Sequence, residues 1–371
     1  MTSEAGRQPS LTRGRPGATM AGVAARVGVS RTTVSNAYNR PDQLSAELRA
    51  QILAAAAELG YSGPDPVARS LRTRQADAVG LIFAERLGYA FRDPGAVEFL
   101  QGLGEACTER GRSLLMIPAG PDAGRVETVL RAAVDGFVIS SVAAGDPLLA
   151  AALSRAQPAV IVDSPRGIAG VDFVGIDDQA AFAMLARHVL DLGHRRIGVL
   201  AVRRGEDVPP APQPTPLPER IKIGQLPHPV RQLRLAGLLD AVAQQPAADQ
   251  AQVWLSERAA NGRDEGARGA AELLDAGLGL TAIMCTSDIL ALGVLDELSA
   301  RRIVAGVPLT VTGFDDVPAA AAAGLTTVHQ PMQDKGRAAI EALLDDRPRE
   351  QASTTILPTR LVVRSSSGPP C

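Results

Sequence analysis

Residues 30–39, Ser-Arg-Thr-Thr-Val-Ser-Asn-Ala-Tyr-Asn, are rich in side chains that form hydrogen bonds. In a helix, Arg31, Thr32 and Asn36 would share the exposed face. Arginine and asparagine can each make two hydrogen bonds to a purine edge in the major groove of DNA, and threonine can bond to several bases. We therefore expect these three side chains to contact bases and a second set to contact phosphates, namely Thr33, Ser35 and Asn39.

Two short helices separated by a glycine-containing turn are predicted to position this face. Thr19 is a suitable N-cap for a helix over residues 20–27, and Ser30 for a second helix that buries Val34 and Ala37. This spacing is typical of a helix-turn-helix, in which the start of the second helix enters the major groove. Ser30 therefore joins the candidate DNA contacts.

A third helix is indicated by Ser45 as its N-cap, apolar residues at helical spacing, and Gly60 at its end. The alternative is a plain three-helix bundle without DNA-binding function. Charge favours DNA binding, because residues 1–75 hold ten arginines against five acidic residues, whereas the rest holds 28 basic against 35 acidic residues. A basic head on an acidic body is the asymmetry expected when one end meets phosphates.

A short hinge helix is predicted to follow the head. Asp65 can cap it, Pro66 fits the first helical position, and residues 67–72 would continue it for barely two turns. A helix this short is unstable alone, so it needs a partner such as a second copy. Leu71 could then wedge into a minor-groove base step, with Ala68 beside the DNA. The alternative is a linker that starts with proline and carries an ordinary exposed leucine.

The sequence resembles the lac repressor and galactose repressor family. The resemblance rests on Val-Ala-Ala-Arg-Val-Gly-Val-Ser-Arg-Thr-Thr-Val-Ser after Met20, Glu-Leu-Gly-Tyr at 58–61 and Val-Ala-Arg-Ser-Leu-Arg-Thr at 67–73, and it covers roughly residues 17–362. It implies a helix-turn-helix domain at 17–63, a hinge at 64–75 and an effector-binding and dimerisation domain at 76–364. Members usually carry arginine where this chain has Asn36, so an operator read through adenine is plausible.

The remaining chain alternates short apolar runs with amphipathic stretches, which predicts a parallel α/β fold in two lobes. Lobe 1 is expected over about 76–174 and 332–355, and lobe 2 over about 175–330. The predicted strands are 78–83, 113–117, 136–140, 159–163, 197–201, one near 253, 282–285 and 311–313. The predicted helices are 96–110, 125–133, 147–155, 179–192, 231–244 and 263–276. Such lobes hold a ligand at the carboxyl ends of their strands, as in the periplasmic sugar-binding proteins that this family resembles.

The resemblance also implies a set of effector contacts, most of them just after predicted strands. Carboxylates accept hydrogen bonds from vicinal hydroxyls, arginine donates in a fork, and an aromatic ring covers a sugar face, so the set suits a polyol. Capping a neighbouring helix is the alternative for each aspartate. The expected contacts are Phe91, Ser140, Asp163, Arg234, Ser287, Asp288 and Asp315, with Trp254 as a candidate aromatic platform.

A proline-rich insertion, residues 203–230, interrupts the pattern of lobe 2. It holds eight prolines and shows no periodicity, so an extended or disordered flap is expected. It could cover the mouth of the cleft or be a tolerated surface insertion.

Composition and motifs argue against catalysis, metal binding, cofactors and membrane insertion. The four histidines lack zinc-binding spacing, and His194 is expected to orient a loop. Neither a nucleophile elbow nor a phosphate-binding loop occurs, and Gly102-Leu103-Gly104 lies inside a helical pattern. Three scattered cysteines and the lack of a signal peptide or long apolar run favour a protein of the reduced cytoplasm, associated with the nucleoid.

The sequence thus predicts a homodimeric DNA-binding regulator whose heads occupy half-sites of a palindromic operator. A small effector, expected to be a sugar, would change the angle between the lobes and so the spacing of the hinge helices. Release from DNA by an inducer is the main expectation, and a purine or other corepressor is the alternative. A non-regulatory solute-binding protein and a regulator with a non-functional pocket are the rivals. The C-terminal residues lack a leucine heptad, which favours a dimer over a tetramer.

Overall fold

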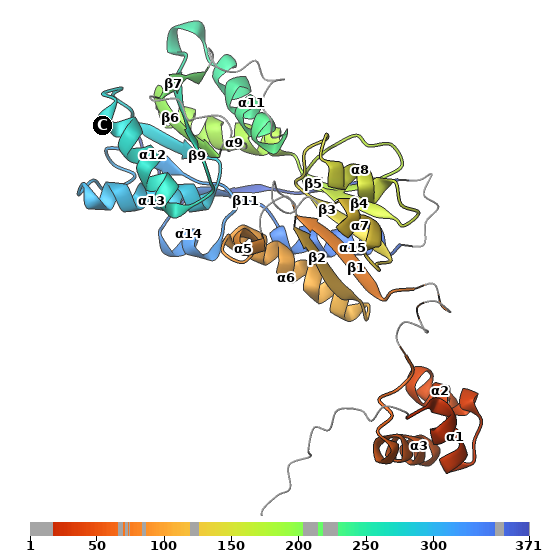
Figure 1. Ribbon diagram of the computed structural model, residues 1–371. Coiled ribbons are helices and arrows are strands. Elements are labelled where there is room, and N and C mark those ends of the chain that lie inside the picture. Colours follow the sequence, from red (N-terminus) through yellow and green to blue (C-terminus); the bar gives the residue numbers. More distant parts are fainter. Residues whose placement is uncertain are drawn as a thin grey trace, which may run out of the picture. The chain divides into compact units, whose positions relative to one another are not determined.

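The computed structural model describes residues 18–65, 70, 73, 75–83, 87–118, 126–202, 214–217, 229–345 and 352–370. The chain divides into two compact units, Met1–Ala76 and Asp77–Cys371, which are described separately below (Figure 1). The predicted hinge contacts Ala68 and Leu71 lie outside the described residues, and so does most of the proline-rich insertion.

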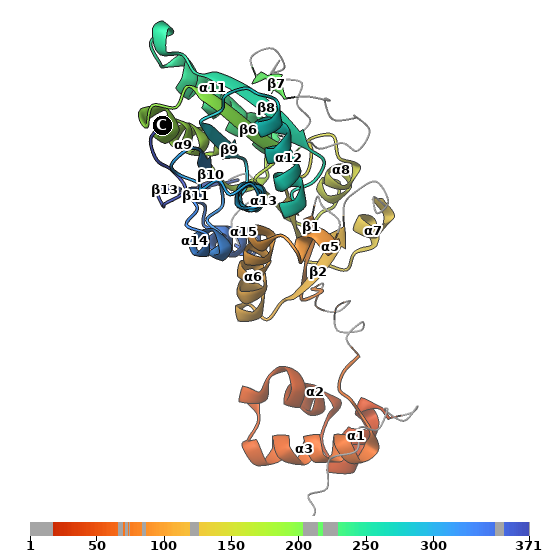
Figure 2. The same cartoon turned by 90° about the vertical axis from the view of Figure 1, so that its left-hand side faces the viewer.

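The head consists of the three predicted helices, α1 (Met20–Val27), α2 (Arg31–Asn39) and α3 (Ala46–Leu59), and a 3-10 turn at Pro41–Gln43 (Figure 2). The predicted caps are confirmed, because the side-chain oxygens of Thr19, Ser30 and Ser45 each accept a backbone N–H of the following turn. Both glycines that end helices adopt left-handed backbone, with φ of 78° at Gly28 and 72° at Gly60. The core is made of Val23, Ala24, Val34, Ala37, Ile52, Ala55 and Ala56.

Lobe 1 contains a parallel sheet that, among the described residues, has six strands in the order β12-β5-β4-β3-β1-β2. The strands are β1 (Ala78–Phe83), β2 (Ser113–Pro118), β3 (Gly136–Ser140), β4 (Ala159–Val162), β5 (Asp172–Ile176) and β12 (Thr354–Leu357). The helices of this lobe are α5 (Leu87–Ala90), α6 (Pro94–Glu109), α7 (Val126–Arg131), α8 (Pro147–Leu153) and α15 (Met332–Leu343).

Lobe 2 contains a second sheet, with the order β10-β9-β6-β8-β7 within the described part of the chain. Its strands are β6 (Arg196–Val202), β7 (Thr215–Pro216), β8 (Gln252–Arg258), β9 (Ala282–Cys285) and β10 (Thr310–Thr312), and β11 (Thr327–His329) pairs separately with β13 (Arg360–Val362). Its helices are α9 (Asp178–Asp191), α11 (Pro229–Ala243), the 3-10 turn Ala247–Asp249, α12 (Arg263–Asp275), α13 (Asp288–Ala300) and α14 (Pro318–Ala322).

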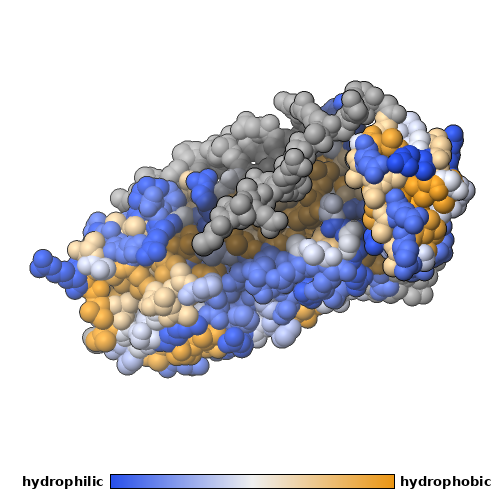
Figure 3. Space-filling view, turned by 90° about the horizontal axis from the view of Figure 1, so that it is seen from below, coloured by the Kyte–Doolittle hydropathy of each residue, from blue (hydrophilic) through white to orange (hydrophobic). Residues whose placement is uncertain are grey.

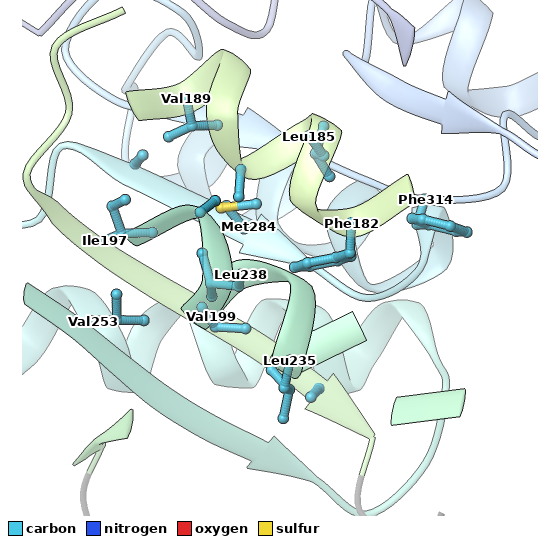
Figure 4. Packing of buried hydrophobic residues seen from close by; sticks show 14 of the residues in the cluster. Phe182, Leu185, Val189, Ile197, Val199, Leu235, Leu238, Val253, Met284 and Phe314 are labelled. Carbon is cyan, nitrogen blue, oxygen red and sulfur yellow. The ribbon is translucent and has the colours of Figure 1, made fainter. Parts of the chain in front are cut away.

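Helices cover both faces of each sheet, which confirms the predicted doubly wound α/β fold. In lobe 1, α6 and α15 pack on one face and α7 and α8 on the other. In lobe 2, α9 and α11 cover one face and α12 and α13 the other. Figure 4 shows the first of the lobe 2 cores, where Phe182 and Leu185 of α9 meet Leu235 and Leu238 of α11 above strand residues such as Val199.

Glycines allow the helices of three pairs to approach closely. A Cβ atom at Gly102 of α6 would lie 2.0 Å from the carbonyl oxygen of Gln333 at the start of α15. A Cβ atom at Gly237 of α11 would lie 2.1 Å from a backbone oxygen of α9, and one at Gly293 of α13 would lie 2.0 Å from a backbone oxygen of α12. Because these distances are far below van der Waals contact, only glycine fits at these crossings.

The sequence did not predict strands β5, β7, β11, β12 and β13 or the C-terminal segment. β5 and β12 pair with each other at one end of the lobe 1 sheet, and β12 is half exposed, which weakens its apolar pattern. After β13, residues 363–370 pack on lobe 2, where Ser366 is buried and its backbone oxygen accepts from Val311 N. His194 is buried beside this segment and bonds through Nε2 to Gly368 O at 2.9 Å, which confirms its structural role.

The described part of the proline-rich insertion extends the lobe 2 sheet. Thr215 and Pro216 form β7, which pairs antiparallel with Leu255 and Trp254 of β8, and the adjacent Leu217 is fully buried. The flap hypothesis concerns residues outside the described part.

Hydrophobic and hydrophilic residues are interspersed on the face shown in Figure 3, and none of the described helices is long and apolar enough to cross a membrane.

Candidate DNA-reading face and effector cavity

The first two turns of α2 carry the predicted base-contacting side chains. Arg31 and Thr32 are exposed and Asn36 is half-buried, because Val34 and Ala37 on the opposite side are fully buried in the core of the head. The Asn36 side-chain amide donates to Gln43 Oε1 at 3.3 Å, so the 3-10 turn helps to orient it. Packing of Val34 and Ala37 thus fixes the position of α2 on the head. The opposite, polar face, with Arg31, Thr32 and Asn36, is the one predicted to contact DNA.

The other predicted contacts on α2 also stabilise the helix itself. Ser30 Oγ accepts from Thr33 N at 3.0 Å and bonds to the Thr33 hydroxyl at 2.8 Å. The Asn39 side-chain amide donates to the backbone oxygen of Ser35 at 3.0 Å and to its hydroxyl at 3.2 Å. These groups therefore have local structural roles, and their contacts with phosphate remain a prediction.

A cavity of about 210 Å³ is lined by residues of both lobes. Its walls follow the carboxyl ends of several strands, as expected for doubly wound sheets. The polar lining residues are Asp93, Ser140, Ser141, Asp163, Arg231, Arg234, Asn261, Thr286, Ser287, Asp315 and Gln330, and the apolar ones include Phe83, Phe99, Val202, Val230 and Met332. Five of the eight predicted effector residues are among them, namely Ser140, Asp163, Arg234, Ser287 and Asp315.

Two predicted aromatic contacts do not line this cavity, which corrects the sequence-based expectation. Phe91 is 63% exposed in the turn before α6, and Asp93, two residues later, lines the cavity instead. Trp254 lies in the amino-terminal half of β8, away from the carboxyl ends that form the cavity, and the Arg196 guanidinium lies 5.2 Å from its ring centre. Its role as an aromatic platform is therefore wrong for this site.

Asp288 is the third predicted contact that does not line the cavity. Its carboxylate is fully buried and accepts hydrogen bonds from Thr327 Oγ1 at 2.6 Å and Val317 N at 2.9 Å. These bonds join the start of α13 to neighbouring loops of lobe 2, so Asp288 has a structural role. Burial raises its pKa to about 6, although the hydrogen bonds act in the opposite direction.

This pKa predicts an acid-stabilised lobe 2. When the pKa of a carboxyl is higher in the folded than in the unfolded state, the protein loses stability as pH rises from the unfolded-state pKa to the folded-state pKa. Between pH 4 and 6 this group should lower the free energy of unfolding by about 2 kcal/mol, and Asp288→Asn should remove that slope. Urea titrations followed by fluorescence of the single tryptophan, Trp254, measure it. Asp296→Asn on the same helix is the control, because Arg263 lowers the pKa of Asp296.

Among the described residues, Arg234 and Arg231 are the arginines that line the cavity. Arg234 Nε donates to Asp178 Oδ1 at 3.0 Å, Arg234 Nη1 donates to Thr286 O at 2.6 Å, and the Arg234 guanidinium lies 3.8 Å from the centre of the Phe314 ring. These contacts use Nε and Nη1, so Nη2 is the part of the fork that can donate to a ligand in the cavity. Packing and hydrogen bonds on three sides pre-organise the guanidinium for this role.

Each lobe contributes an aspartate to the acidic wall of the cavity, Asp163 from lobe 1 and Asp315 from lobe 2. Asp163 follows β4 in lobe 1 and Asp315 follows β10 in lobe 2, with φ of 63° and 125°, conformations that are costly for residues other than glycine. Gln330 lies between them and donates from Nε2 to Asp315 Oδ1. Burial raises the pKa of Asp315 well above its usual value, with Arg234 opposing the shift. Asp163 also uses Oδ1, which accepts a hydrogen bond from Lys335 Nζ. Within the described residues, neither Asp163 Oδ2 nor Asp315 Oδ2 accepts a hydrogen bond.

A chain of side chains also connects the two lobes along the cavity. Asp93, the N-cap of α6 in lobe 1, accepts a hydrogen bond from Asn261 Nδ2 at 2.7 Å, and Asn261 lies in the loop after β8 of lobe 2. Ser287, the N-cap of α13, donates to Asn261 Oδ1. Sequence reasoning missed Asp93 and Asn261, because both lie in loops and resemble ordinary capping and turn residues.

Neither a metal centre nor a disulfide is found in the described part of the chain. Those residues contain no group of three histidine, cysteine or acidic side chains that could hold a metal ion. Cys107 and Cys285 are buried free thiols, and burial raises the pKa of each, which disfavours the reactive thiolate.

Comparison with known proteins agrees with this architecture. Residues 19–63 match "Bacterial regulatory proteins, lacI family", residues 76–209 match "Periplasmic binding proteins and sugar binding domain of LacI family", and residues 186–367 match "Periplasmic binding protein-like domain". An HTH-type transcriptional regulator of Mycolicibacterium smegmatis is 45% identical over 359 residues, which are 95% of this chain and 97% of the relative.

Solved structures of similar fold are also found. A LacI-family transcriptional regulator from Corynebacterium glutamicum is 36% identical with a TM-score of 0.67, over 95% of this chain and 99% of that one. A complex of the transcriptional regulator CelR with cellobiose is 25% identical with a TM-score of 0.63, over 95% and 100% of the two chains.

A helix-turn-helix head joined to a two-lobed body of the periplasmic-binding-protein type defines a class of DNA-binding transcriptional regulators, not of enzymes. The chain belongs to the LacI family of that class.

Proposed function

We propose that this regulator is a homodimeric repressor that leaves a palindromic operator when a neutral sugar or related polyol binds in the cavity between its lobes. The supporting observation is that Asp163, Asp315 and Arg234 line that cavity, while Asp163 Oδ2, Asp315 Oδ2 and Arg234 Nη2 take part in none of the hydrogen bonds found among the described residues. Acceptors from two lobes and a donor fork suit vicinal hydroxyl groups, whose oxygens both donate and accept.

The size and composition of the cavity also favour a small polyol. Its volume of about 210 Å³ is sufficient for a small ligand such as a sugar. Phe83, Phe99 and Met332 supply apolar surface against which a sugar ring can pack. A structurally similar regulator, CelR, was solved as a complex with cellobiose.

Thermal unfolding of the full-length protein with a panel of small molecules tests this proposal. The panel contains D-ribose, D-glucose, cellobiose, hypoxanthine and glucose 6-phosphate. A neutral sugar that stabilises the protein and lowers its affinity for selected DNA supports the proposal. Stabilisation by hypoxanthine together with tighter DNA binding would instead identify a corepressor-type regulator. A lack of response to any sugar would contradict a sugar sensor.

Arg31 is expected to read a base, so Arg31→Ala should weaken specific DNA binding far more than non-specific binding. The preferred duplex is first obtained by selection from a random library with the wild-type protein, and affinities are then measured at fixed salt. Loss of a base contact should cost about 1–3 kcal/mol, or roughly 5- to 150-fold in Kd. Affinity for unrelated duplex should change much less.

The matched control is Arg26→Ala, which removes the same charge from the head. Arg26 is exposed on α1, outside the predicted reading helix, and pairs with Glu58 of α3 at 3.2 Å. It should change specific and non-specific affinity by similar small factors. If Arg31→Ala behaved like Arg26→Ala, Arg31 would have only an electrostatic role.

A further inference from the structure

Lys335 is an unusual residue in this chain. The sequence contains 36 arginines and only two lysines, and Lys335 is one of them. Its side chain is only 1% exposed, in the first turns of α15. A lysine at a buried position in a chain that otherwise uses arginine indicates that this position requires a compact ammonium group rather than a planar guanidinium.

The Lys335 ammonium connects polar residues of the two lobes. Its Nζ donates to Asp163 Oδ1 and to Gln330 Oε1, both at 2.8 Å. Gln330 in turn donates from Nε2 to Asp315 Oδ1. The line Asp163–Lys335–Gln330–Asp315 therefore runs from lobe 1, through the segment that crosses between the lobes, to lobe 2. Three of its four members line the cavity, and Lys335 lies behind them.

Stability alone does not account for this arrangement. A buried charge pair is often no more stabilising than well-packed apolar residues of similar volume. In addition, a cation in the first turns of a helix faces the positive end of the helix dipole. Apolar residues at positions 163 and 335 together would avoid both costs, so the charged pair must contribute something that apolar packing cannot.

We propose that Lys335 is a positioning residue of the effector site. It holds Asp163 by one oxygen and fixes the orientation of the Gln330 amide, and through Gln330 it fixes Asp315. One carboxylate oxygen from each lobe is thereby presented to the same ligand. This inference rests on the proposed polyol function and adds the residue that aligns the acidic walls of the two lobes.

The arrangement also favours an uncharged ligand. The cations in and behind the cavity wall are each paired with a carboxylate: Lys335 with Asp163, Arg234 with Asp178 and Arg231 with Glu257. An anionic effector would have to compete with these carboxylates, whereas hydroxyl groups can use the remaining oxygens without displacing any pair. Lys335 is thus expected to set the preference for neutral over cationic ligands, because it balances the charge of Asp163.

The first test compares binding of D-ribose, D-glucose and D-glucosamine to the wild-type protein and Lys335→Met. We expect affinity for a neutral sugar that the wild type binds to fall by about tenfold or more. Affinity for D-glucosamine relative to D-glucose should rise by about tenfold, because the sugar ammonium can pair with the unbalanced Asp163. A purely structural role would weaken binding of both sugars equally. Unchanged affinities would overturn the proposal.

Two further variants separate positioning from folding. Arg337→Met is the matched control, because Arg337 lies on the same helix and pairs with Glu109 at the surface, 2.6 Å away. It should bind all three sugars like the wild type. Lys335→Met combined with Asp163→Asn leaves no unbalanced charge, so it should recover stability relative to Lys335→Met without recovering the affinity for the neutral sugar. Recovery of that affinity would contradict the positioning role.

A second measurement needs no effector. In protein labelled with ¹⁵N-lysine only two side-chain ammonium signals are expected, and Lys222→Arg identifies that of Lys335. A buried ammonium with two hydrogen-bond acceptors should exchange slowly and give a sharp signal at neutral pH, which Asp163→Asn should broaden or shift. The absence of that signal would overturn the arrangement itself. If the signal is present but the wild type binds no sugar, the fault lies in the proposed function.

Discussion

Replacement of Arg234 by methionine should abolish the response to the effector and destabilise lobe 2 by about 3–5 kcal/mol. The guanidinium is the cation closest to Asp178, whose carboxylate is only 1% exposed, and methionine would leave that charge buried and poorly compensated. The variant would also lose the bond to Thr286 O and the contact with the Phe314 ring. Urea unfolding followed by Trp254 fluorescence measures the loss, and thermal shifts with the responsive sugar measure binding.

The pH dependence of this loss provides a stricter test. Burial already raises the pKa of Asp178, and Arg234 opposes that shift, so removal of Arg234 should raise the pKa further. A carboxyl with a raised pKa in the folded state destabilises folding most above that pKa, and protonation relieves the cost. The deficit of Arg234→Met should therefore be largest at pH 8 and smaller at pH 5.

Arg166→Met is the matched control for Arg234. Arg166 approaches the other oxygen of the same carboxylate, at 3.6 Å from Asp178 Oδ2, but its side chain is 36% exposed. A pair accessible to solvent contributes little, so this variant should lose less than about 1 kcal/mol. Equal losses for the two variants would show that burial beside Arg234 does not control the energetics of the site.

Gly102→Ala is expected to be the most disruptive methyl addition in lobe 1. The new Cβ atom would lie 2.0 Å from the Gln333 carbonyl oxygen and under 3 Å from two further backbone atoms, so α6 and α15 must separate. Overpacking of this kind typically costs about 1–3 kcal/mol and sometimes more, and here the obstacle is rigid backbone. Thermal unfolding by circular dichroism measures the effect. Because α15 carries Lys335, weaker sugar binding should accompany it.

The same helix supplies the control. Gly104 is two residues further along α6, and nothing lies within 4 Å of a Cβ atom built there. Gly104→Ala should therefore stabilise the helix, by up to about 1 kcal/mol, because alanine loses less backbone entropy than glycine. The two substitutions are chemically identical, so opposite signs can only reflect the helix crossing. Similar effects would mean that the two helices can move apart at little cost.

Much of this fold could be predicted because its signals are local. The three helices of the head begin at capping hydroxyls and two end at left-handed glycines, and these interactions involve residues at most a few positions apart. The buried strands of the two sheets show continuous apolar runs, as at Val79–Phe83 and Ala282–Cys285. β12 was missed because a half-exposed edge strand lacks such a run, and residues 363–370 because their backbone bonds go to distant segments.

The candidate site could be predicted only in part, because only some of its residues carry a local signal in the sequence. Ser140 ends β3, Asp163 directly follows β4 and Asp315 comes three residues after β10, and parallel strands bring their carboxyl ends together. Asp93 and Asn261 lie in loops 168 residues apart in the sequence, and only the closeness of the lobes joins them. Trp254, the candidate aromatic platform, lies elsewhere, because its register on β8 places it toward the opposite end of the sheet.

The sequence by itself determined that this chain is a DNA-binding regulator with a helix-turn-helix head and a two-lobed α/β body, since motifs, caps and apolar periodicity are written in neighbouring residues. The tertiary structure alone decided which polar groups face one cavity and which only hold the fold. Asp288 and Asp163 both come close after strands, yet one is enclosed by Thr327 and Val317 and the other keeps an oxygen for a ligand. The tertiary structure also revealed the position of Lys335 between Asp163 and Gln330. The cost of a buried ammonium depends on partners that only folding brings within hydrogen-bond distance.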